Sequence, residues 1–84
     1  MGRETAIIIF KCAEKNIEVD MEIPLDITVM ELFVALNTAY GLGADISDTR
    51  KWYLKAENPI ALLRGNKTLH QCGIRNGSII NYAE

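Results

Sequence analysis

Two apolar segments near the amino-terminal end have the spacing of an antiparallel hairpin. Ala6 to Phe10 is β-branched and aromatic, residues 13–16 form a polar break, and residues 17–23 alternate apolar and acidic side chains with a period of two. Such alternation is typical of a strand with one buried and one solvated face. The acidic side chains of the second strand should face water, and its apolar ones should share the other face: Ile17, Val19, Met21 and Ile23.

The orientation of the first strand is harder to assign, because every position from 7 to 10 is apolar. We place Ile8, Phe10 and Cys12 inward, which leaves Ile7 and Ile9 on the other face. A slip of one residue would exchange the two faces.

A helix is predicted to begin at Thr28, because Thr28-Val-Met-Glu31 has the Thr-x-x-Glu spacing of a capping box. Apolar residues then recur every three or four positions, and Gly41 suits the left-handed conformation that ends a helix. This stripe should cover the sheet rather than form a partner groove, since the strands need a second layer. Its members are Val29, Leu32, Phe33, Leu36, Ala39 and Tyr40.

The second half of the chain predicts three further strands. After a glycine-containing loop at 41–49, in which Leu42 or Ile46 packs back, residues 50–56 and 60–63 form strands separated by a turn at Asn58-Pro59. Thr68 then caps one helical turn ending at Cys72, and Asn76-Gly77 leads into the last strand. The inward residues are expected to be Trp52, Leu54, Ile74, Ile80 and Tyr82, and the outward ones Tyr53, Lys55, Ile79, Asn81 and Ala83.

This order of elements predicts an α+β fold, a mixed sheet of four to five strands with one helix packed across it. The first and last strands should be parallel neighbours at its centre, which is the β-grasp arrangement. The 84 residues fit one domain, 1–84.

Charge and hydropathy exclude several function classes. Nine basic and eleven acidic side chains give a formal charge of −2 without a basic cluster, so we expect no nucleic-acid partner. The apolar run from Ala6 to Phe10 is too short for a bilayer span or a signal peptide. We therefore expect a cytoplasmic protein that does not insert into membranes.

The residues that could carry chemistry do not form a recognisable site. His70 and Cys72 lie in one helical turn and should point to different sides, without a third residue to complete a relay. Cys12 and Cys72 lack zinc-ligand spacing and are expected to be free thiols, with a disulfide or redox pair as the alternative. Asp45 and Asp48 lack the further oxygens that calcium needs. We expect no catalytic residue, no metal site and no cofactor.

The closing segment, Thr68-Leu-x-x-Cys-Gly-Ile-x-Asn-Gly-Ser-Ile, resembles that of ubiquitin-like domains. With Trp52 at the start of the third strand, the Leu-x-x-Cys-Gly-Ile-x-Asn-Gly pattern of this segment more narrowly resembles the YukD/EsaB family. Members of that family are ubiquitin-like proteins of the type VII, WXG100-exporting secretion systems of Gram-positive bacteria. The resemblance implies a cytosolic accessory or regulatory component whose partners are proteins of the secretion apparatus, some of them membrane-associated. The sequence ends at Ala83-Glu84 without the Gly-Gly tail of conjugated relatives, so conjugation is not expected.

Without an expected reaction, function should depend on exposed side chains. The candidate partner-binding residues are Tyr53, Lys55, Ile7, Ile9 and Ile79, with Lys51 and the 64–67 turn as further candidates. The same apolar residues could serve a homodimer. The positions that form ubiquitin's receptor patch hold Tyr53, Asn81 and Ala83, so ubiquitin receptors should bind poorly. A sulfur carrier and a β-grasp interaction module of another assembly are the alternative functions.

Overall fold

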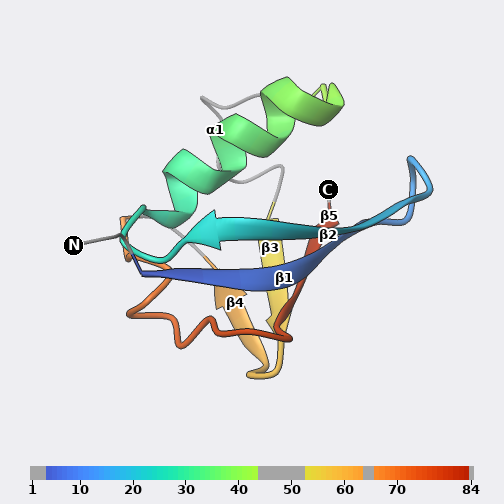
Figure 1. Cartoon of the computed structure of the whole chain (residues 1–84). Coiled ribbons are helices and arrows are strands. Elements are labelled where there is room, and N and C mark those ends of the chain that lie inside the picture. Colours follow the sequence, from blue (N-terminus) through green and yellow to red (C-terminus); the bar gives the residue numbers. More distant parts are fainter. Residues whose placement is uncertain (1–3, 44–52, 64–65, 84) are drawn as a thin grey trace.

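The sheet and the helix of this protein pack as two layers (Figure 1). The computed structural model describes residues 4–43, 53–63 and 66–83. Within these ranges the elements are β1 (Thr5–Cys12), β2 (Ile17–Pro24), α1 (Val29–Tyr40), β3 (Tyr53–Glu57), β4 (Ala61–Leu63) and β5 (Ile79–Ala83).

The five strands lie in the order β2-β1-β5-β3-β4, with the first and last strands of the chain side by side. β1 pairs antiparallel with β2 along its whole length and parallel with β5, where Ile9 is the partner of Ile79. β3 pairs antiparallel with both β5 and β4. The predicted β-grasp arrangement is therefore confirmed, with the parallel pair near the centre of the sheet.

Helix α1 begins and ends where the sequence predicts. The Glu31 amide donates to Thr28 Oγ1 at 3.1 Å, and Glu31 Oε1 accepts from the Thr28 amide at 3.1 Å, which completes the capping box. Gly41 closes the helix in the left-handed conformation, with φ of 60°. Ala39 is exposed, so its assignment to the buried stripe was wrong. At 100° per residue it lies about 70° from the centre of the stripe, where its short side chain does not reach the sheet.

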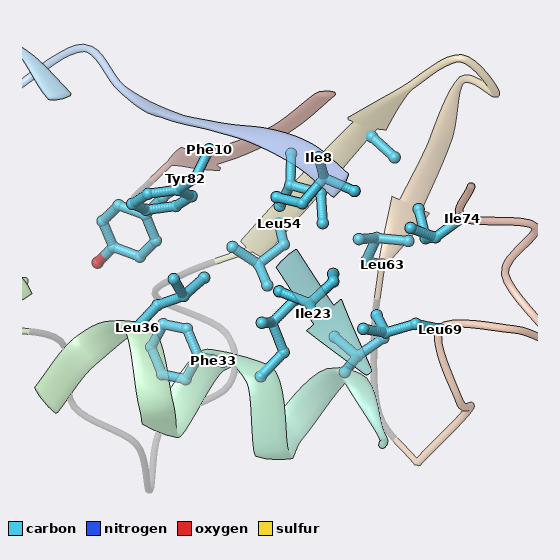
Figure 2. Packing of buried hydrophobic residues seen from close by; sticks show 14 of the residues in the cluster. Ile8, Phe10, Ile23, Phe33, Leu36, Leu54, Leu63, Leu69, Ile74 and Tyr82 are labelled. Carbon is cyan, nitrogen blue, oxygen red and sulfur yellow. The ribbon is translucent and has the colours of Figure 1, made fainter. Parts of the chain in front are cut away.

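The core lies between α1 and the sheet. Figure 2 shows Phe33 and Leu36 of the helix directed toward the inward side chains of the strands, and the Phe33 and Tyr82 rings stack with centroids 6.0 Å apart. Leu42 is buried, as predicted, whereas Ile46 and Trp52 lie outside the described residues.

The turn between β3 and β4 is longer than the sequence predicts. Because pairing resumes only at Ala56 and Ala61, Ile60 belongs to the turn and is 81% exposed.

The segment before β5 anchors the start of the helix. Thr68 caps its own turn as predicted: its Oγ1 accepts from the Gln71 amide at 3.1 Å, and Gln71 Oε1 accepts from the Thr68 amide at 2.9 Å. Thr68 also forms an isolated antiparallel bridge with Thr28, so the two capped turns lie side by side. Leu69 of this turn is completely buried.

Candidate interaction surface

The face of the sheet opposite α1, which we call the open face, carries all five predicted partner-binding residues. Ile7 and Ile9 come from β1, Ile79 from β5, and Tyr53 and Lys55 from β3. Side chains alternate along a strand, and the inward neighbours Ile8, Phe10 and Cys12 are at most 1% exposed. The predicted orientation of β1 is therefore confirmed.

Three isoleucines form one apolar cluster on the open face. Ile9 and Ile79 are direct partners across the parallel pair, so their side chains lie next to each other. Ile7 is two positions away on β1 and is 56% exposed, whereas Ile9 and Ile79 are half-buried. We call Ile7, Ile9 and Ile79 the isoleucine cluster.

Tyr53 and Lys55 lie on the same face, in rows beyond the one that contains Ile9 and Ile79. Ile79 pairs with Glu57, and Tyr53 lies four residues before Glu57 on β3. The Cα atoms of Tyr53 and Glu57 are therefore roughly 13 Å apart at about 3.3 Å per residue. Lys55 pairs with Leu62 of β4, which is 53% exposed and was missed by the sequence reasoning. A strand of three residues has too few positions for alternation to reveal which of its side chains point outward.

Carboxylates border the isoleucine cluster on two sides. Asp20 of β2 is the partner of Ile9, and Glu57 of β3 is the partner of Ile79, so one row across four strands has the order carboxylate, isoleucine, isoleucine, carboxylate. Glu22 pairs with Ile7 in the neighbouring row. We call Asp20, Glu22 and Glu57 the acidic rim. Sequence reasoning treated the β2 carboxylates only as a solvated surface.

Each rim carboxylate has a different environment. Glu22 Oε2 accepts from Thr5 Oγ1 at 2.6 Å, and Glu57 Oε2 accepts from Asn81 Nδ2 at 3.1 Å. Asp20 is exposed, and no ion pair to it occurs among the described residues. Next to the rim, Glu18 lies 3.7 Å from Lys11 Nζ, so that acid already has a cationic partner.

His70 and Cys72 lie in the turn before β5 and have separate surroundings. His70 Nε2 is 3.8 Å from Glu4 Oε2, and its side chain is 66% exposed. Both cysteines are free thiols, with Cys12 buried and Cys72 half-buried. Burial raises the pKa of the Cys72 thiol above its ordinary value, while the charge of Lys67 opposes that shift. Such a thiol is a poor nucleophile at neutral pH.

The described residues also show no metal cluster and no membrane-spanning helix. They contain no group of three or more His, Cys, Asp or Glu side chains placed to hold a metal ion. Among the same residues, α1 is too short to be a membrane-spanning helix, and no other helix there qualifies.

Several solved structures share the fold at low sequence identity. The C-terminal ubiquitin-like domain of mouse tubulin-specific chaperone e is 16% identical, with a TM-score of 0.76 over 98% of this chain and 88% of that one. Trypanosoma brucei tubulin-binding cofactor B is 10% identical, with a TM-score of 0.73 over 94% and 93%. The ubiquitin-like domain of the Mycobacterium tuberculosis type VII secretion system protein ECCD1 is 13% identical, with a TM-score of 0.60 over 96% and 99%.

Comparison with curated protein sequences gave no match. Among protein families, the one described as "WXG100 protein secretion system (Wss), protein YukD" matches residues 7–81, nearly the whole chain. This match agrees with the ubiquitin-like sheet and helix. The chain therefore belongs to the YukD family of WXG100 secretion proteins.

Proposed function

We propose that this protein is an accessory component of a type VII secretion system that acts in the cytoplasm by non-covalent recognition of another protein of the apparatus. The open face is the recognition surface. The observation that carries this proposal is the pairing of Ile9 with Ile79 beside the exposed Ile7.

Folding alone does not account for isoleucine at position 7. Ile7 leaves 56% of its surface in water, so it contributes little to the core. Threonine would keep the β-branched shape that strands favour without exposing an apolar side chain. Clustered apolar side chains on the surface of a small protein typically mark a contact with another macromolecule.

The test replaces exposed isoleucine by threonine at the site and at a matched position elsewhere. The Ile7→Thr/Ile79→Thr double variant should lose recovery of secretion-system proteins and should reduce export of WXG100 proteins from the producing cell. Ile60→Thr is the control, because Ile60 is 81% exposed but lies in the β3–β4 turn. Thermal unfolding of both purified variants checks that they remain folded. Wild-type recovery and export by a folded double variant would refute the proposal.

The non-covalent part of the proposal has its own test. The protein is isolated from cells together with its partner, and the complex is then denatured and analysed by mass spectrometry. We expect the chain to separate with its unmodified mass. A product in which it stays attached to another protein after denaturation, or carries a sulfur or nucleotide adduct, would instead indicate a conjugated modifier or a sulfur carrier.

A further inference from the structure

The charges around the isoleucine cluster indicate what kind of partner segment fits it. We propose that the open face binds an amphipathic α-helix whose apolar stripe is flanked on both sides by lysine or arginine. This inference rests on the proposed function, because it specifies the partner of the same surface.

The width of the apolar row matches a helix. Asp20 and Glu57 occupy the ends of a row across four neighbouring strands, so their Cα atoms are roughly 14 Å apart at about 4.8 Å per strand. An α-helix with its side chains is about 10–12 Å wide. A helix lying along β1 and β5 would therefore place its apolar stripe on Ile9 and Ile79 and its flanking side chains within reach of both carboxylates.

A partner strand would not use this site. Strand addition requires the unpaired backbone groups of an edge strand, and the edges of this sheet are β2 and β4. In the isoleucine cluster, Ile9 and Ile79 have paired strands on both sides, and the Ile7 amide and carbonyl bond to Asn76 and Gly77. Recognition there depends on side chains alone, which a helix presents without needing further backbone hydrogen bonds.

The charges favour a basic partner over an acidic one. Three rim carboxylates border the cluster, and the Thr5 and Asn81 hydrogen bonds hold two of them in place. Among the described residues, two lysines of this face lie in the next row, where Lys11 is opposite Glu18 and Lys55 is opposite Asn81. A second copy of the chain would bring its own acidic rim, and like charges bordering a contact oppose association.

The inference is tested with two designed peptides of about 14 residues, or about four helical turns. Both carry the same leucine stripe, and their polar positions are all lysine in one and all glutamate in the other. Each is titrated into the full chain while backbone amide chemical shifts are followed by NMR. The lysine peptide should shift the amides of the isoleucine cluster, with affinity that falls as salt is added. The glutamate peptide should bind at least tenfold more weakly.

Charge-neutralising variants locate the effect on the rim. Asp20→Asn/Glu57→Gln should weaken binding of the lysine peptide about fivefold, because two exposed ion pairs are typically worth about 0.5 kcal/mol each. The glutamine at 57 can still accept the hydrogen bond of Asn81, so the sheet should be unaffected. Glu14→Gln in the β1–β2 turn is the matched control and should bind like the wild type.

Three results would overturn the inference: shifts that map away from the open face, equal binding of the two peptides, or unchanged affinity of the rim variant. Sedimentation showing a dimer that the Ile7→Thr/Ile79→Thr variant dissolves would assign the face to a second copy instead. The variants also distinguish failure of the basic-helix inference from failure of the proposed function. If that threonine variant abolishes recovery of secretion proteins while Asp20→Asn/Glu57→Gln retains it, the surface is correct and the basic helix is wrong.

Discussion

Ser78 is a buried polar residue whose hydroxyl connects the start of β5 to the β3–β4 turn. Its side chain is inaccessible to solvent. The hydroxyl donates to the Asn58 carbonyl at 2.6 Å and accepts from the Arg75 amide at 3.0 Å. Because Ile79 follows directly and pairs with Glu57, this connection also holds together one end of the isoleucine cluster.

Ser78→Ala should destabilise the protein by about 2 kcal/mol. The substitution removes two hydrogen bonds, each worth about 0.5–1.5 kcal/mol net, and leaves a carbonyl and an amide without this partner. At roughly 0.05–0.15 kcal/mol per residue, a chain of 84 residues has a total stability of about 4–12 kcal/mol. The loss is therefore a substantial fraction of the whole, and it should lower Tm by about 10 °C.

Urea unfolding and a thermal melt monitored by circular dichroism measure this difference. Thr38→Ala is the control, because Thr38 is exposed on α1 and alanine is the better helix former, so its stability should stay the same or rise slightly. Amide NMR should show the Ser78→Ala changes centred on residues 58, 75 and 79. A loss smaller than about 0.5 kcal/mol, which is the range of ordinary surface substitutions, would refute this account of Ser78.

Three further predictions concern the paired caps, the core and a thiol. Thr28→Ala and Thr68→Ala should each lower the free energy of unfolding in urea by about 1 kcal/mol. Because the two caps lie side by side, we expect them to support each other, and additive losses in the double variant would contradict this. Leu69→Ala should cost about 2–5 kcal/mol in the same assay, and a smaller loss would mean that the site collapses around the cavity. The raised pKa of Cys72 means that the folded state holds the thiol proton more tightly than the unfolded state does. The free energy of unfolding should therefore fall as the pH rises from the ordinary thiol pKa to the raised one, and Cys72→Ser should flatten that slope. Because Cys12 is buried, it should react with iodoacetamide more slowly than Cys72.

The sequence predicts most of the fold because local rules agree with the tertiary structure. The capping box at Thr28 and the left-handed Gly41 place both ends of α1 correctly. The orientation of β1 was less determined, because positions 7–10 are all apolar; the structure places Lys11 on the same side of the sheet as Ile9 and Ile7. Their partners on β2 are the acidic residues, which also prefer water.

The candidate site could be predicted only in part, because its composition depends on pairing between distant strands. Period two identifies Ile9 and Ile79 as outward residues individually, whereas Glu57 lies beyond the strand predicted at 50–56. Their adjacency requires the parallel register of β1 with β5 and the antiparallel register of β5 with β3. No short sequence pattern determines those registers, and none indicates the hydrogen bond from Ser78 to Asn58, which lie 20 positions apart.

Because side chains alternate along each strand, the residues that stabilise the core and the residues proposed for recognition are direct neighbours in sequence. Ile8 and Ile80 are at most 1% exposed and pack against α1, so truncating them opens a cavity and costs several kcal/mol. Ile7 and Ile79 are their neighbours in sequence but face away from the core; a change to threonine removes little buried area at Ile7 and a moderate amount at the half-buried Ile79. Because stability and binding lie on opposite faces of the same strands, an effect of the outward residues on secretion cannot be attributed to unfolding when the protein melts like the wild type. This separation makes the open face a testable site in a protein without an evident reactive centre among its described residues.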